Sequence, residues 1–277
     1  MCARSPVTAA NSGMRSLSAG RRDFQGNNMT GKIPVRLRKE PLLEAIWEIR
    51  FTASEQSVAE LLPGVLFQRL GQRYRKLVKL PAWYIPPHLA DQDPSLANSP
   101  KIRLENANQA ILVGDRVIAL SCRRPYSGWT KFSADIRELA EAVHATGFVQ
   151  KLDRFSLQYI DLLQVPQQIG IDCLDMKLKL AQREVHAEPV HLRTEIQDNG
   201  LVHLVQIISP AEVRMPGTQE RLKGVLVDID SIQLLGSEDS WELAEQRLDQ
   251  VHTASKRLFF GLLTPETLRA LEPVYEE

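Results

Sequence analysis

The sequence predicts an α+β protein made of two similar β-α-β-β-β-α units, which form antiparallel sheet with helices packed on one face. Three observations predict this fold. Short runs alternate between apolar and polar residues, two longer segments carry amphipathic helical patterns, and the same order of elements occurs in residues 35–150 and again in residues 151–277. We expect one compact body, resembling a saddle or a ferredoxin-like plait, whose other sheet face is free to bind something or to be covered by a second copy.

The first unit is expected to open with a strand at its N-terminal end. Within residues 42–51, Ile46, Glu48 and Arg50 alternate with Trp47, Ile49 and Phe51, so the two sets point to opposite faces. The spacing of apolar residues predicts a helix over 55–78, split at Pro63 and Gly64. The remaining expected elements are a short strand over 82–85, strands over 101–104 and 110–122 that reverse at 106–109 or at 114–115, and a helix over about 130–147.

The second unit is expected to repeat this order. A strand over 152–165 places Phe155, Leu157, Tyr159 and Asp161 on one face. The elements expected after it are a helix over 172–184, strands over 190–197 and 201–208 joined at Asp198-Asn199-Gly200, a strand over 225–234, a helix over 240–263 capped by Ser240, and a short helix capped by Thr264.

The first 28 residues differ from the rest of the chain. They are rich in Ser, Ala, Gly, Asn and Arg, and such a segment cannot bury enough apolar surface to order itself. Two interpretations remain open: residues 1–28 are a disordered tail, or the natural chain starts at Met29 and the upstream residues come from an over-extended gene prediction.

The composition limits the classes of function. Hydrophobic residues make up 43% of the 277 residues, as in ordinary globular proteins, and Lys plus Arg equals Asp plus Glu at 34 each. A neutral balance makes nucleic-acid binding unlikely, because phosphate-binding proteins are usually basic. The three cysteines have no metal-site or redox spacing, and no apolar run could span a membrane. We therefore expect a cytoplasmic protein without a membrane partner.

Four segments carry a family resemblance. They are Pro41-x-x-Glu44-Ala-x-x-Glu48-Ile-Arg50-Phe51, then Tyr126-x-Gly128-Trp129-x-x-Phe132, then Leu157-x-Tyr159-Ile160, and last Leu226-x-Asp228-Ile-Asp230 with Phe260-x-x-Leu263-Thr264. Together they resemble a sporadically distributed, uncharacterised family of bacterial and archaeal proteins of roughly 250 residues. The resemblance covers Val35 to Leu271 and implies a start near Met29. It implies no activity, and Gln158 and Asp161 depart from the Arg and Asn that family members often carry there.

Catalytic and cofactor motifs are absent from the sequence, which favours a non-catalytic role and implies no cofactor and no metal. Asp228 and Asp230 lie two residues apart on a predicted strand, so both carboxylates face one side. They could hold Mg²⁺ or share acid–base work, or they could be the solvated face of a strand. Glu48 and Arg50 likewise could anchor a ligand or pair across strands.

Three hypotheses follow from these features. The first is a binding or assembly protein that uses an open sheet face or edge, as a homodimer or with a protein partner. The second is a small-ligand sensor or enzyme with a site between the two halves, built from Glu48, Arg50, Tyr159, Asp161, Asp228 and Asp230. The third is a nucleic-acid-associated, defence-type protein, which requires the basic residues to gather on one face.

Overall fold

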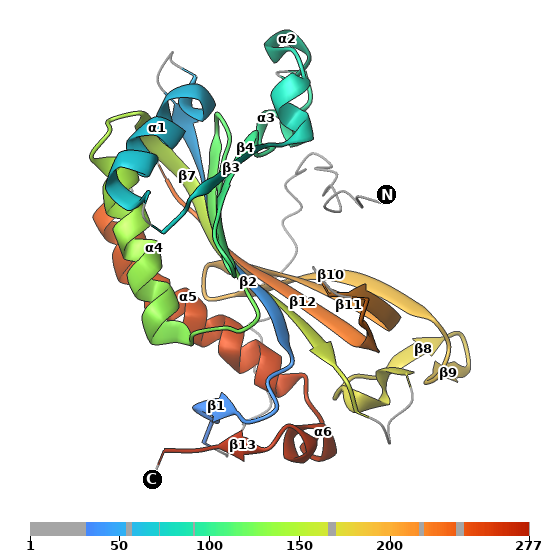
Figure 1. Ribbon diagram of the computed structural model, residues 1–277. Helices are drawn as coiled ribbons and strands as arrows, with labels where there is room; N and C mark the ends of the chain where they lie inside the picture. Colours follow the sequence, from blue (N-terminus) through green and yellow to red (C-terminus); the bar gives the residue numbers. More distant parts are fainter. Residues whose placement is uncertain are drawn as a thin grey trace.

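The computed structural model describes residues 32–53, 57–71, 73–90, 92–165, 170–215, 219–236 and 241–276. These residues form a mixed α and β protein, in which a large antiparallel sheet carries its long helices on one face (Figure 1). The expectations about residues 1–28, the start at Met29 and the cap at Ser240 lie outside the described residues. Among the described helices, none has the length and apolar character that a membrane crossing requires.

The first half of the chain supplies five strands of the main sheet. Its elements are β1 (Arg36–Leu37), β2 (Leu42–Ala53), α1 (Val58–Leu70), β3 (Lys76–Lys79), a 3-10 helix (Pro81–Tyr84), α2 (Pro87–Ala90), α3 (Pro94–Ala97), β4 (Ile102–Glu105), β5 (Gln109–Val113), β6 (Val117–Arg123) and α4 (Trp129–His144).

The second half supplies the other four strands of the main sheet. Its elements are β7 (Val149–Leu163), a 3-10 helix (Gly170–Cys173), β8 (Leu178–Leu180), β9 (Arg183–Val185), β10 (Val190–Asp198), β11 (Leu201–Arg214), β12 (Arg221–Leu234), α5 (Trp241–Gly261), α6 (Pro265–Ala270) and β13 (Pro273–Val274). Two small ribbons, β1 with β13 and β8 with β9, lie outside the main sheet.

The nine strands of the main sheet follow the order β10-β11-β12-β7-β2-β6-β5-β4-β3. The long strands β2 and β7 lie at the centre and pair antiparallel from Leu42 to Ala53. Outward from β2 come β6, β5, β4 and β3, and outward from β7 come β12, β11 and β10. In each half, the first strand of the main sheet lies at the centre, and the last strand lies directly beside it. The strands that come between these two along the chain lie further out.

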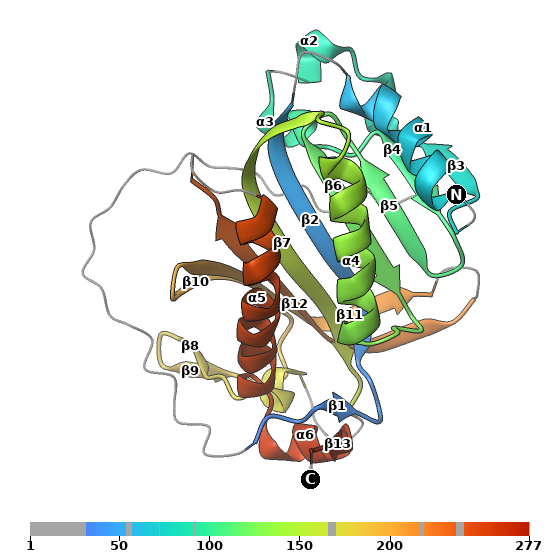
Figure 2. The ribbon, with the colours of Figure 1, turned by 90° about the vertical axis from the view of Figure 1, so that its left-hand side faces the viewer.

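The main core lies between the sheet and α1, α4 and α5. On β2, Trp47, Ile49 and Phe51 are buried against the helices. The buried apolar side of α4 begins with Phe132 and Ile136. Figure 2 shows α4 and α5 side by side across the sheet, with α4 over the first half and α5 over the second. The alternation predicted for residues 46–51 is confirmed, since Ile46, Glu48 and Arg50 lie on the opposite face.

The helix predicted over 172–184 is wrong. The segment contains a 3-10 turn and the β8–β9 hairpin instead, and Ala181 adopts a positive φ of 54° at the reversal. The amide of Ile171 donates to the carbonyl of His186, which ties the ends of the segment together. Leu174 is buried, but Leu180 is 65% exposed, so the segment has no continuous apolar side for a helix to bury.

Three smaller predictions also need correction. Pro63 does not split α1, because the helix is continuous and the proline ring is part of its buried side, but the helix ends at Leu70. Residues 81–84 form a 3-10 helix and not a strand. Both reversals considered between residues 101 and 122 exist, since β4, β5 and β6 are separate strands. The Asn199-Gly200 turn between β10 and β11 is confirmed.

Candidate functional site

The sheet face opposite α1, α4 and α5, which we call the open face, carries a row of charged side chains on its three central strands. Cross-strand pairing places Glu48 and Arg50 of β2 next to Arg154 and Ser156 of β7. The same pairing places Asp228 and Asp230 of β12 next to Ile160 and Gln158. Because paired residues in an antiparallel sheet share a face, all these side chains point the same way.

Arg154 is at the centre of an ion-pair network. Its Nη2 lies 2.8 Å from Oε1 of Glu48 and 3.9 Å from Oδ2 of Asp230. Glu48 also accepts a hydrogen bond of 2.9 Å from Nε of Arg50. The network joins β2, β7 and β12, and its three main members are only 17–23% exposed. Strands from both halves of the chain therefore share one partly desolvated group of charges.

This network is not fully satisfied. Nε of Arg154 and Oδ1 of Asp230 are buried without a hydrogen-bond partner among the described residues. Burial raises the pKa of Asp230, and the guanidinium of Arg154 opposes that shift. Burial also raises the pKa of Asp228 to about 6, against the hydrogen bond of 2.8 Å that it accepts from Gln158. A buried polar atom without a partner costs free energy, so these two atoms lower the stability that the network contributes.

Tyr159 and Asp161 lie on the other face of the sheet. Tyr159 pairs with Ala45 and Ile229, which are core residues beneath the helices. Its hydroxyl is 2.9 Å from Nδ1 of His252 on α5, and the His252 ring stacks on Trp129 of α4 with centroids 3.9 Å apart. These contacts fasten α4 and α5 to β7, which is a structural role.

Asp161 is 5% exposed and also faces the helix layer. Burial raises its pKa to about 8, and nearby Glu40 adds to the shift while Arg124 opposes it. The Arg124 guanidinium donates to the carbonyl of Leu42 and, at 2.8 Å, to the carbonyl of Glu40. Asp161 is thus a carboxyl that is largely protonated at neutral pH inside the core.

The six residues proposed for one site therefore form two groups. Glu48, Arg50, Asp228 and Asp230 lie together on the open face, whereas Tyr159 and Asp161 are separated from them by the sheet. Sequence reasoning missed Arg154 and Gln158, which complete the first group. The alternating pattern of residues 153–161 could have identified Arg154 and Gln158, because both fall on the strand face opposite Phe155 and Leu157.

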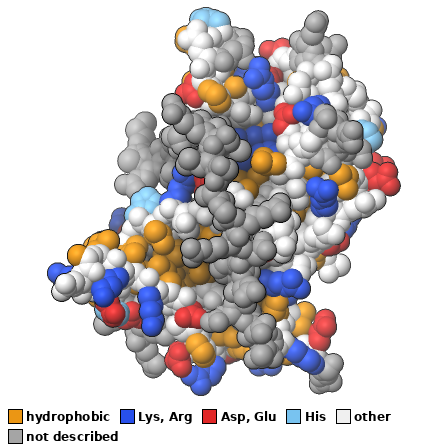
Figure 3. Space-filling model, turned by 180° about the vertical axis from the view of Figure 1, so that it is seen from behind, with side chains coloured by type: hydrophobic (Ala, Val, Ile, Leu, Met, Phe, Trp, Pro, Cys, Tyr) orange, Lys and Arg blue, Asp and Glu red, His pale blue; other side chains and the backbone are white. Residues whose placement is uncertain are grey.

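Hydrophobic side chains flank the charged network on the open face. Pairing from β12 through β11 places Leu226 opposite Ile208, and Ile160 lies beside Asp228. These three side chains are partly exposed. Figure 3, seen from behind, shows hydrophobic side chains gathered on the lobe at the lower left, where β10, β11 and β12 project from the centre of the molecule.

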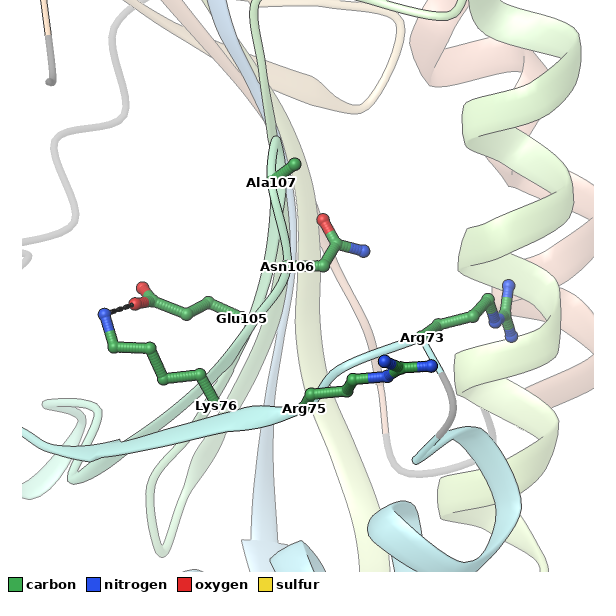
Figure 4. Close-up of a pocket in the computed structure, with 6 residues that line it drawn as sticks. All are labelled: Arg73, Arg75, Lys76, Glu105, Asn106 and Ala107. Carbon is green, nitrogen blue, oxygen red and sulfur yellow. Dashed lines mark hydrogen bonds and ion pairs between the residues drawn. The ribbon is translucent and has the colours of Figure 1, made fainter.

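A shallow depression of about 400 Å³ lies at the far end of the sheet, away from the network. Its lining is Arg73, Arg75, Lys76, Glu105, Asn106 and Ala107 (Figure 4). Two of the cations there have anionic partners: Lys76 contacts Glu105 at 2.5 Å, and Arg73 contacts Asp135 and Glu138. The depression contains none of the six residues proposed for the site from the sequence.

Within the part of the chain that the structure describes, no group of three or more His, Cys, Asp or Glu side chains could hold a metal ion. No family model matches the sequence, and no curated protein matches it.

Proposed function

We propose that this protein is a non-catalytic binding or assembly module that takes a protein partner on its open face. The observation that carries the proposal is the network of Glu48, Arg154 and Asp230, which lies partly desolvated on the sheet face opposite the long helices α1, α4 and α5. Charges of this kind are normally either solvated or covered by a matching surface.

The chemistry of the open face favours a protein partner. Apolar side chains such as Ile160, Ile208 and Leu226 flank the charged centre, and buried polar atoms of Arg154 and Asp230 lack a hydrogen-bond partner among the described residues. A protein segment offers apolar side chains together with polar and charged groups, so it can complement both the apolar flank and the partly exposed charged centre.

Nucleic acid is a poorer fit to the same face. Arg50 and Arg154 both contact Glu48, and Arg123 lies 3.5 Å from Glu44. A nucleic-acid-binding surface needs cations that are available to replace the counterions of phosphates, whereas these cations already have carboxylate partners. The formal net charge of zero argues in the same direction.

The proposal includes an internal duplication of the fold. Within the main sheet, each half of the chain contributes its first strand to the centre and its last strand beside the first. In each half a long helix follows that last strand and lies over the strands of its own half. The network of Arg154 then lies where the two units meet. The resemblance to the sporadic family of bacterial and archaeal proteins is part of the same proposal, and the buried free thiols of Cys122 and Cys173 support a reducing, cytoplasmic location.

A second candidate function is favoured by one observation. Nε of Arg154 is a donor and Oδ1 of Asp230 is an acceptor in the same ion-pair network, and both are buried without partners in the described part of the chain. A movement of the side chains that cover these two atoms would let a small ligand with an acceptor and a donor satisfy them. This is the sensor hypothesis without Tyr159 and Asp161.

Matched substitutions on the two faces test the proposal. Leu226→Lys places a charge on the open face, and Leu61→Lys places the same charge on α1, where Leu61 is 45% exposed. We expect wild type and Leu61→Lys to capture the same protein from a lysate of the native cells. Capture by Leu226→Lys is expected to fall roughly tenfold, because a charge in a desolvated contact weakens binding strongly. Equal capture by all three proteins contradicts the proposal, provided circular dichroism shows equal folding.

A further inference from the structure

The edge strand β10 has a sequence that is complementary to itself. Among the strands that the structure describes, β10 is the last in the main sheet and pairs on one side only, with β11. Arg193, Thr194 and Glu195 are exposed at its middle, and neither Arg193 nor Glu195 makes an ion pair or a side-chain hydrogen bond with another described residue. We propose that β10 pairs antiparallel with β10 of a second copy of this chain, which joins two sheets into one.

A twofold axis through Thr194 gives the pairing its register. When two identical edge strands pair antiparallel with their sheet faces aligned, residue i of one copy lies opposite residue j of the other. The sum i + j is then the same even number for every pair. With Thr194 opposite Thr194 of the partner, Arg193 lies opposite Glu195 of the partner subunit, and the same contact occurs twice. Leu192 then lies opposite Ile196 of the partner subunit on the helix side of the sheet, and all nine residues of β10 are used.

Neighbouring registers are worse. An axis through Arg193 brings two guanidinium groups together, and an axis through Glu195 brings two carboxylates together. Like charges directly opposite each other across strands are destabilising, whereas opposite charges and apolar pairs each stabilise the pairing. The register centred on Thr194 is therefore selected by charge as well as by length.

The other edge of the sheet does not offer this arrangement. β3 has four residues, with Lys76 and Lys79 at its two ends. Short, lysine-bearing edge strands are a common way in which proteins prevent edge-to-edge pairing. β10 is more than twice as long and carries both signs of charge, so the two edges differ in what they can pair with.

Charge reversal tests the pairing. Arg193→Glu and Glu195→Arg each turn both cross-strand contacts in the symmetric dimer into repulsions. Both side chains are exposed, so the variants should fold as wild type does. By sedimentation equilibrium we expect wild type to dimerise and each variant to dimerise at least roughly tenfold more weakly. An equimolar mixture of the two variants restores dimers, because every contact in the heterodimer again joins opposite charges.

Disulfide trapping tests the register. Thr194→Cys places two thiols opposite each other on the axis, at the Cα separation of directly paired strands, which suits a disulfide. Gln197→Cys is the matched control, since that residue lies well away from its copy. We expect rapid oxidation to a covalent dimer for the first variant only.

Three results would overturn the inference: a monomeric wild type over the whole concentration range, a dimer that both charge reversals leave intact, or a mixture that does not reassociate. The inference does not need the open face to bind a partner. Leu226→Lys tests that face and the β10 variants test the edge, so each proposal can fail alone.

Discussion

The guanidinium of Arg154 lies 2.8 Å from Oε1 of Glu48, and this contact joins the first strand of one half of the chain to the first strand of the other. The two side chains are 18% and 23% exposed, so the contact is partly shielded from water. An ion pair in such a position stabilises a specific geometry of the β2–β7 pair, and its loss leaves a charge without its partner.

Glu48→Gln tests the importance of that contact. The substitution keeps the shape of the side chain but removes the anion from Arg50 and Arg154. We expect the free energy of unfolding to fall by about 1–3 kcal/mol in urea titrations, the range for a partly buried charged hydrogen bond. Glu272→Gln is the control, because Glu272 pairs with Lys39 on the surface, and it should leave the unfolding midpoint unchanged. Equal midpoints for the two variants would contradict the role given to Glu48.

Tyr159→Phe tests the link between β7 and α5. The variant keeps the aromatic ring in the core but leaves Nδ1 of the half-buried His252 without the hydroxyl that lies 2.9 Å away. We expect a loss of about 1–2 kcal/mol in the free energy of unfolding. Tyr84 is 74% exposed, so Tyr84→Phe provides the same chemical change without the contact and should behave as wild type. A neutral Tyr159→Phe would show that the hydroxyl contributes nothing to stability.

Asp161→Asn tests the protonated carboxyl in the core. The pKa of Asp161 is about 8 in the folded protein against an ordinary 3.8. Between these two pH values the folded protein therefore binds one proton at Asp161 that the unfolded chain does not bind. The stability that this proton contributes is complete below pH 3.8 and is lost as the pH rises through 8. We expect the wild-type free energy of unfolding to decrease over that window, and the asparagine variant to lose this decrease.

The free energy of unfolding should be compared at pH values above 6.5. Burial and nearby Lys256 lower the pKa of His252 to about 4, so stability linked to His252 is complete above 6.5 and lost as the pH falls. From pH 6.5 to 8 the decrease that Asp161 contributes should be about 1–2 kcal/mol. Asp153 is 45% exposed, and Asp153→Asn should keep the wild-type slope. An unchanged slope in Asp161→Asn would mean that the carboxyl is already ionised.

Local signals in the sequence were sufficient for elements whose cause is local. The Asn199-Gly200 turn adopts positive φ at both residues, as two-residue hairpins require, and the Thr264 hydroxyl accepts a hydrogen bond from the amide of Thr267 at the start of α6. The helix expected over 172–184 failed for the opposite reason. That segment is held by long-range contacts, such as the hydrogen bond from the Asp175 amide to the Leu262 carbonyl just beyond α5, which no local pattern reveals.

The grouping of the site residues shows a second limit. Alternation assigned Glu48 and Arg50 to one face of their strand, and Tyr159 and Asp161 to one face of theirs. It could not assign which face of β7 matches which face of β2, because that choice depends on long-range pairing. A shift of one residue in register exchanges the two faces. Tyr159 pairs with Ala45 on the helix side, and Arg154 takes the place beside Glu48 and Arg50.

Hydroxyl-radical footprinting of the protein, alone and with its captured partner, tests the central claim most directly. If the open face is the binding surface, labelling of Leu226 and Ile208 should decrease in the complex, whereas labelling of Leu61 and Phe67 on α1, which are 45% and 57% exposed, should stay the same. Protection of the α1 residues with unchanged labelling of Leu226 and Ile208 would contradict the account.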